Sequence, residues 1–214
     1  MSLPIGFAIA GVTLASLVHH VPSPERSPVA SAAVAGDVAA VRAALAAGAD
    51  PNAVADHGFT PLDWAARFGQ IETMKALVDA GAALDLRDEG PNGWTPIMHA
   101  LHKGQARAAL ALLEWGADPD SRSDNGQTPL MRAACEDVPE VVRALLARGA
   151  DPRATTEGGT NVLTFAVNGC NSEIVRAIRV AAPDEQVSND LNGFLARMTA
   201  CLRCRSDVLP LLRN

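Results

Sequence analysis

The sequence predicts an all-α fold made of stacked helix-turn-helix units, and three observations lead to this prediction. The 214-residue chain is rich in alanine, lacks tyrosine and holds only 4% aromatic residues, which favours closely packed helices. A Thr-Pro motif opens one set of segments, at Thr60, Thr95 and Thr128. A Gly-Ala motif closes another set, at Gly48, Gly81, Gly116 and Gly149. Both motifs keep steps of 33 or 35 residues, with the same two-residue excess between the second and third units, which indicates one repeated architecture.

The composition argues against several classes of protein. A hydrophobic fraction of 48% with 20% charged residues argues against a disordered chain. The formal net charge of −6 argues against the basic face that a phosphate backbone requires, so we expect no nucleic-acid partner. Four cysteines in 214 residues are too few for a small secreted disulfide scaffold. What remains is a folded chain that is long enough to bury a sizeable core.

The second unit shows why each unit is expected to form two helices. Thr60 and Pro61 predict a helix start, because the hydroxyl caps free amides and a proline at the first position has no amide to leave unpaired. A narrow apolar stripe follows, at Leu62, Ala65 and Ala66. A second apolar stripe at helical spacing comes next, at Ile71, Met74, Leu77 and Val78. Gly81 ends the second helix, and because no unit buries its apolar faces alone, the units are expected to stack.

Weaker units flank the three clear ones. The first unit opens with Ser27-Pro28-Val29 and closes with Gly48-Ala49-Asp50. The fifth opens with Asn161-Val162-Leu163 and has no closing Gly-Ala-Asp. A partial sixth unit is expected between about Leu195 and Leu212, where apolar residues again recur at helical spacing.

These motifs resemble the ankyrin repeat, whose unit of about 33 residues starts with T-P-L-H-x-A and ends with G-A-D. The resemblance implies an ankyrin-type solenoid with projecting finger loops, in which residues 27–183 form five repeats and residues 184–214 form a C-terminal partial repeat or cap. One position departs from the family's pattern throughout. The histidine after T-P-L is replaced by Ala30, Asp63, Met98, Met131 and Thr164. We therefore expect the usual hydrogen bond of this histidine to the threonine to be missing.

The linking segments predict the finger loops. Asn125-Gly126, within residues 120–127, has the chemistry of a tight turn. The two extra residues before the third repeat fall between Asp88 and Trp94, where glycine and proline place them at the tip of a finger. This longer finger is expected to stand out from the row.

The first 26 residues form an apolar N-terminal segment with a Pro-rich linker. Residues 3–18 carry no charge and have the length of the apolar region of a signal peptide, and a segment reaching to residue 21 would suit membrane attachment. This favours an exported, periplasmic or membrane-anchored protein. The alternative is a cytoplasmic protein whose N-terminal helix covers the open face of the first repeat.

Candidate chemistry is sparse. Cys201 and Cys204 form a lone C-x-x-C, which allows a local disulfide but lacks the second pair of a zinc site. His99 and His102 lie three residues apart, and a metal would need a third ligand. No phosphate loop, nucleophile elbow or zinc-protease motif occurs in the sequence. We expect neither an enzyme nor a cofactor or metal.

The resemblance instead implies a protein partner, bound by a monomeric chain at the finger tips and the exposed side of the first helices. Carried over to this sequence, it marks a concave groove on the second to fourth repeats, at His57, Phe59, Arg67, Phe68, Asn92, Trp94, His102, Lys103, Asn125, Gln127, Cys135 and Glu136. Phe59, Phe68 and Trp94 would anchor the partner as an aromatic cluster. The alternative is that Phe59 and Trp94 only pack against the neighbouring finger. A membrane-tethered or periplasmic scaffold, placed by its N-terminal segment, is the competing function.

Overall fold

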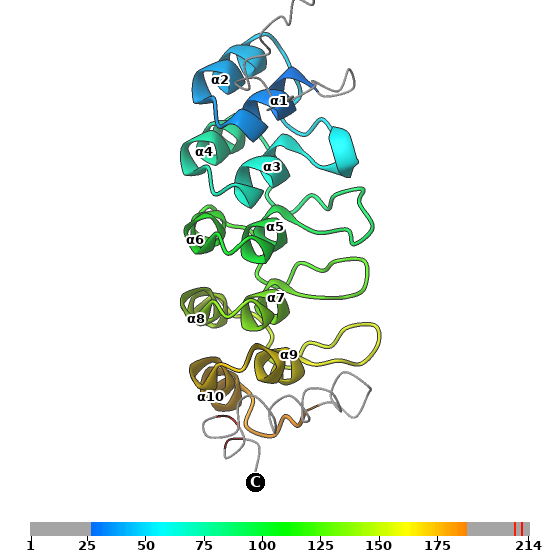
Figure 1. Cartoon of the computed structure of the whole chain (residues 1–214), viewed down its shortest axis with the longest axis vertical. Helices are drawn as coiled ribbons and strands as arrows, with labels where there is room; N and C mark the ends of the chain where they lie inside the picture. The colour runs from blue at the N-terminus through cyan, green and yellow to red at the C-terminus, as the bar shows by residue number, and fades with distance from the viewer. Residues whose placement is uncertain (1–26, 188–207, 209–210, 212–214) are drawn as a thin grey trace, which may run out of the picture.

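The computed structural model describes residues 27–187, 208 and 211, and this part of the chain forms five pairs of α-helices. The first helices of the pairs are α1 (Pro28–Ala35), α3 (Pro61–Arg67), α5 (Pro96–His102), α7 (Pro129–Cys135) and α9 (Val162–Gly169). The second helices are α2 (Val38–Ala46), α4 (Ile71–Asp79), α6 (Ala106–Glu114), α8 (Pro139–Ala147) and α10 (Ser172–Ala181). Figure 1 shows the two sets as parallel columns, with loops projecting beside the first set. The predicted helical solenoid is confirmed.

The first helices begin at the predicted caps. The side chains of Ser27, Thr60, Thr128 and Asn161 each accept a hydrogen bond from the amide three residues later. These bonds pair amides that the helix itself leaves free. Thr95 is different, since its hydroxyl makes no cap and lies 3.5 Å from the hydroxyl of Ser121 in the next finger.

The family's histidine is absent from this position, as the sequence shows, but in the second repeat Asp63 supplies other hydrogen bonds to Thr60. The amide and the hydroxyl of Thr60 both donate to Oδ2 of Asp63, each at 2.8 Å, while the Asp63 amide donates back to the hydroxyl. In the fifth repeat the hydroxyl of Thr164 donates to Oδ1 of Asn161 at 2.7 Å. An aspartate or a threonine at the position of the family's histidine therefore also tethers the residue that caps the helix.

The turn between paired helices uses one left-handed residue in every repeat. Gly36, Gly69, Gly104, Asp137 and Cys170 occupy it, with φ between 59° and 70°. Two of these five are not glycine, and the side chain of Asp137 accepts a hydrogen bond from the side-chain amide of Asn171. The turn geometry is thus kept even where the residue adopts it at some cost.

The core lies between the helices and runs the length of the stack. The third position of each Thr-Pro-type opening is almost fully buried, at Val29, Leu62, Ile97, Leu130 and Leu163. Buried alanines on the first helices let neighbouring repeats approach closely. Because each layer covers the apolar face of the next, the repeats stabilise one another.

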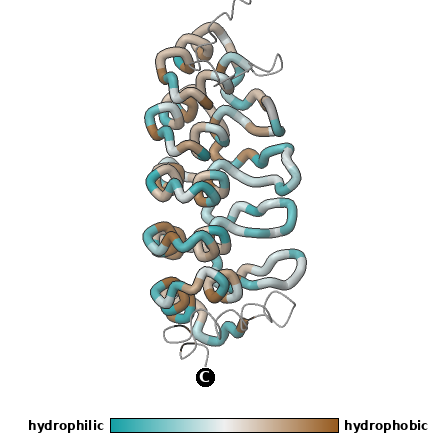
Figure 2. Tube along the Cα trace, in the orientation of Figure 1, coloured by the Kyte–Doolittle hydropathy of each residue, from teal (hydrophilic) through white to brown (hydrophobic). Residues whose placement is uncertain are grey.

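The finger loops form a row of hairpins joined at their tips. An amide-to-carbonyl bond closes each loop across five residues at 55–59, 123–127 and 156–160, but across seven at 88–94, so the two extra residues lie where they were predicted. One backbone bond then links each tip to the next, from Glu89 to Gly58, Asp124 to Asn92 and Glu157 to Asn125. Figure 2 shows that the loops are mostly hydrophilic.

The longer finger was expected to stand out from the row, but in Figure 1 it reaches about as far as its neighbours. Backbone bonds hold it on both sides, through the Glu89 amide and the Asn92 carbonyl. The additional residues therefore widen the loop and leave its reach unchanged.

The two ends of the chain are described only in part. Residues 1–26 lie outside the described residues, so the N-terminal segment and its linker stay a prediction. Within the described part no helix is both long and apolar enough to cross a membrane. Near the other end, Val208 is buried and the carbonyl of Leu211 accepts two hydrogen bonds from Arg179 on α10. The assignment of residues 184–214 as a cap also stays a prediction.

Candidate protein-binding face of the second to fourth repeats

The repeat register places nine of the predicted partner-binding residues in columns that run along the stack, together with Trp64, His99 and Arg132, which were not predicted. The predicted finger-tip residues His57, Asn92 and Asn125 lie outside these columns. Three columns come from the ends of α3, α5 and α7: Trp64, His99 and Arg132; Arg67, His102 and Cys135; Phe68, Lys103 and Glu136. A fourth comes from the bases of the fingers, at Phe59, Trp94 and Gln127. We call these twelve residues the inner face.

Aromatic side chains of the second repeat occupy one end of the inner face. The rings of Phe68 and Trp64 are stacked, with centroids 6.0 Å apart and planes 12° apart. The ring centroids of Trp64 and Phe59 lie 4.9 Å apart, and those of Phe59 and His99 of the next repeat lie 4.5 Å apart. These rings form a continuous path from an exposed side chain into the boundary between two repeats.

The path continues into the third and fourth repeats. Trp94 lies 5.4 Å from the ring of His99 and 5.0 Å from that of His102. The guanidinium of Arg132 covers the Trp94 ring at 4.4 Å, a cation–π contact. Arg132 also donates to Oε1 of Gln127 at 2.6 Å, which fixes the guanidinium over the indole.

Glu136 completes the charged end of the inner face. Its carboxylate lies 3.3 Å from Nδ1 of His102 and 3.4 Å from Nη1 of Arg132. Repeat spacing placed His102 and Glu136 on this surface but missed the contact of Glu136 with Arg132. The signal was available, because Arg132 lies four residues before Glu136 on one helix.

A buried pair that includes His99 of the inner face was also missed. Nε2 of His99 lies 2.6 Å from Oδ2 of Asp88, and the two side chains are only 1% and 2% exposed. Burial lowers the pKa of His99 to about 4, although Asp88 opposes this shift. His99 is therefore neutral near pH 7 and donates its Nε2 proton to the carboxylate. The other oxygen of Asp88 accepts the amide of Gly90 at 2.8 Å, so the pair secures the long finger to α5.

Asp63 is a second buried titratable group near this site. Burial raises its pKa to about 7, and its hydrogen bonds from Thr60 offset only part of the shift. The negative charge of Asp88 raises it further. Asp63 and His99 thus depart from their ordinary pKa values in opposite directions, for the same physical reason.

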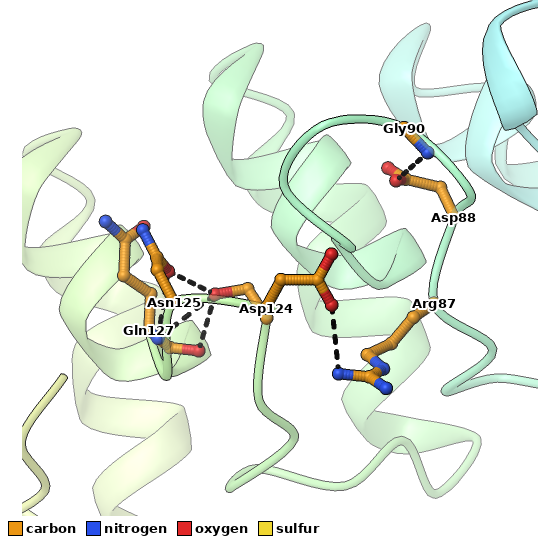
Figure 3. Close-up of polar contacts among 7 residues, drawn as sticks. Arg87, Asp88, Gly90, Asp124, Asn125 and Gln127 are labelled. Atoms are coloured by element: carbon orange, nitrogen blue, oxygen red, sulfur yellow. Dashed lines mark hydrogen bonds and ion pairs between the residues drawn. The ribbon is translucent and has the colours of Figure 1, made fainter. Parts of the chain in front are cut away.

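The fingers that border the inner face are braced by polar contacts (Figure 3). Nη1 of Arg87 lies 3.1 Å from Oδ1 of Asp124 in the next finger. Within that finger Oδ1 of Asn125 accepts from the hydroxyl of Ser123 at 2.7 Å and from the amide of Gln127 at 3.3 Å. These contacts fix the loops before any partner arrives.

The predicted partner-binding residues divide by exposure. The exposed ones are His57, Phe68, Asn92, Lys103, Asn125 and Cys135. The half-buried ones are Phe59, Arg67, Trp94, His102, Gln127 and Glu136. Phe59 and Trp94 pack against His99, and Trp64 connects Phe59 to Phe68. Packing within the stack is therefore one role of Phe59 and Trp94, while Phe68 is 48% exposed.

Cysteines contribute no assembled metal site in the described part. Among the described residues no group of three His, Cys, Asp or Glu side chains could hold a metal ion. Cys135 is a free thiol whose pKa is raised by burial. Cys170 is disulfide-bonded, and its partner lies outside the described residues, as do both Cys201 and Cys204.

Two family models match this chain, and both describe ankyrin repeats. The model for three copies matches residues 80–156, and the model for many copies matches residues 29–78. Together they cover more than half of the sequence, and the chain belongs to the ankyrin repeat family. Ankyrin repeats form a protein–protein interaction module.

Curated relatives match over short regions of repeats. The ankyrin repeat protein nuc-2 of Neurospora crassa is 43% identical over 86 residues, which is 40% of this chain and 8% of the relative. The 26S proteasome non-ATPase regulatory subunit 10 of Dictyostelium discoideum is 42% identical over 60 residues, 28% of this chain and 25% of the relative. The human protein phosphatase 1 regulatory subunit 27 is 39% identical over 68 residues, 32% of this chain and 43% of the relative. The chain thus spans less than half the length of each.

Proposed function

We propose that this protein is a non-catalytic binding module that holds a partner protein on the inner face of its second to fourth repeats. The observation that carries the proposal is the continuous path of ring contacts from Phe68 to Trp94, which ends under the guanidinium of Arg132. Binding energy at protein interfaces concentrates in such aromatic and arginine side chains.

The rigidity of the inner face also supports the proposal. Phe68 rests on Trp64, and Arg132 is held by Gln127 and Glu136, so little side-chain entropy remains to be lost on binding. Asn92 and Asn125 lie exposed at the finger tips beside this surface. The bound partner would meet fixed anchors at the centre and polar groups at the rim.

Capture of partners by the full-length chain tests the proposal. The chain is immobilised, the proteins it retains are identified, and the binding of each is then measured with purified material. We expect Phe68→Ala to weaken binding at least about tenfold, as loss of an anchor does. The matched control is Arg107→Ala, because Arg107 is exposed on α6 in the other layer of helices. Equal binding by both variants would contradict the assignment of the inner face.

We also propose, as a second candidate, that residues 1–26 place the protein outside the cytoplasm, as a periplasmic or membrane-tethered scaffold. The uncharged stretch at residues 3–18 and the disulfide at Cys170 support this, because disulfides persist in oxidising compartments. Fractionation of the full chain and of a chain lacking residues 1–26 is the test. Recovery of both in the cytosolic fraction would refute the placement, and peptide mapping would show which of Cys201 and Cys204 are oxidised.

A further inference from the structure

We infer that the inner face takes an extended acidic segment of its partner, with an apolar side chain of that segment placed on Phe68; this rests on the proposed function. The inference starts from two cations at the ends of neighbouring helices. Arg67 ends α3, and Lys103 directly follows α5. Neither makes an ion pair within the part of the chain that the structure describes.

The charge that the inner face presents differs from repeat to repeat along the stack. In the first repeat the equivalent positions hold Val34 and Ala35, which are uncharged. The second and third repeats then present Arg67 and Lys103, together with the 37% exposed side chain of His102. In the fourth repeat the acidic Glu136 is engaged by Arg132 and His102. The unpaired charge at the centre of the inner face is therefore positive, although the whole chain carries −6.

An apolar contact point lies within this basic region. Phe68 directly follows Arg67 in the chain and is 48% exposed, the only exposed large aromatic side chain among the described residues. Its ring is stacked on Trp64, while the guanidinium of Arg67 lies 5.8 Å from the centre of the Phe59 ring. Both side chains are thus positioned by aromatic neighbours before binding. A partner that satisfies both needs a carboxylate close to an apolar side chain.

A peptide segment fits this arrangement better than a nucleic acid does. Nucleic-acid binding depends on neutralising many phosphates in succession, whereas the inner face offers two unpaired cations, Arg67 and Lys103. The partner segment also has to cross from one repeat to the next. An extended chain with carboxylates on either side of one apolar residue places charges at Arg67 and Lys103 and its apolar group at Phe68.

Three labelled peptides and the full-length protein test the inference. Each peptide has about ten residues, which spans roughly 30 Å when extended. The first is glutamate-rich with a central leucine, the second replaces every glutamate by glutamine, and the third replaces the leucine by serine. Fluorescence anisotropy measures binding. We expect the first peptide to bind at least about tenfold more tightly than either of the others, and to weaken as salt is raised.

A charge-reversed variant supplies the matched control. R67E/K103E should weaken binding of the acidic peptide at least about tenfold, whereas R107E/R148E, with the same change in net charge on the other layer, should leave it within about twofold. Circular dichroism confirms that both variants keep their helices. Equal binding of the acidic and neutral peptides, no binding of any peptide, or tighter binding of a single-stranded oligonucleotide would overturn the inference.

The same variants separate this inference from the proposed function. If Phe68→Ala weakens the binding of captured partners but R67E/K103E binds them with the affinity of the natural chain, the partner segment is not acidic and the inner face still binds it. If neither variant binds captured partners more weakly than the natural chain does, the inner face is not the binding surface. Loss of capture in both variants, with R107E/R148E unaffected, is the result that the acidic segment requires.

Discussion

The imidazole of His99 donates to the carboxylate of Asp88 across 2.6 Å, and both side chains are buried. Asp88 begins the widened finger loop and His99 lies on α5, so the contact joins the loop to the helix beneath it. The pair lies directly behind Phe59 and Trp94, whose rings both contact His99. The geometry of the inner face therefore depends on a polar contact that no partner would touch.

Removing the carboxylate should destabilise the protein. Asp88→Ala leaves a buried imidazole N–H without its acceptor, and we expect the free energy of unfolding in urea to fall by about 2 kcal/mol. Asp124→Ala is the control, because its ion pair with Arg87 is exposed, and it should cost less than about 1 kcal/mol. Equal losses in the two variants would show that the His99 contact contributes nothing beyond a surface pair.

Asp63 and His99 should give opposite pH dependences of stability. Between about pH 4 and pH 7 Asp63 keeps a proton in the folded chain that the unfolded chain releases, so its contribution falls as pH rises. Between about pH 4 and pH 6.5 the unfolded chain protonates His99 while the folded chain leaves it neutral, so its contribution rises with pH. In the natural sequence the two contributions to the free energy of unfolding therefore change in opposite directions with pH.

Single substitutions should reveal how each group alone makes the free energy of unfolding depend on pH. Asp63→Asn keeps an acceptor for Thr60 and removes the contribution of Asp63, so only that of His99 remains and stability should rise from pH 4 to pH 6.5 relative to the natural chain. His99→Gln keeps a donor for Asp88 and removes the contribution of His99, so only that of Asp63 remains and stability should fall as pH rises over the same range. Urea unfolding at several pH values measures both, and parallel curves for the two variants would contradict the assignment.

Phe59 and Phe68 should separate folding from binding. Phe59 is half-buried against Trp64 and His99, so Phe59→Ala should cost about 2 kcal/mol of stability. Phe68 is exposed, so Phe68→Ala should cost less than about 1 kcal/mol while weakening partner binding. Thermal unfolding and binding measured on the same preparations compare them. A larger stability loss for Phe68→Ala would assign that side chain to the core.

Gly169 allows two helices to approach each other. A Cβ at this position would lie 2.4 Å from the carbonyl oxygen of Ala134 on α7, a backbone atom with little freedom to move. Gly169→Ala should therefore destabilise the chain by about 1–3 kcal/mol, although alanine favours helices. At Gly158 the nearest atom is 3.9 Å away, and Gly158→Ala should change stability little. Denaturant unfolding distinguishes the two.

The repeat fold could be predicted because its signal is local and periodic. Thr60-Pro61 and Gly81 mark a helix start and a helix end wherever they recur, and the buried position of Leu62 follows from the same spacing. Nine of the twelve residues of the inner face could be named from the repeat register, which places Arg67 and His102 in one column, and their role in binding stays a prediction. These inferences need no contact between distant residues.

The missed features depend on side-chain geometry between elements. Asp88 and His99 are eleven residues apart, on a loop and a helix, and no spacing rule pairs them. The family pattern predicts only that the histidine's bond is absent, and it does not predict that the Asp63 carboxylate accepts two hydrogen bonds from Thr60. The reach of the long finger was overestimated because the bonds of Glu89 and Asn92 to neighbouring loops leave no trace in the sequence.

The bonds between finger tips have a mechanical consequence. The tips are connected by backbone bonds from Glu89 to Gly58, from Asp124 to Asn92 and from Glu157 to Asn125, and the Arg87–Asp124 ion pair adds a side-chain contact between two of the fingers. The helices of the same repeats pack through apolar side chains. Neighbouring repeats are thus joined by two kinds of contact, an extensive apolar contact between their helices and a smaller polar contact between their loops. Loss of the bond between two tips would therefore leave the apolar contact between the same two repeats in place.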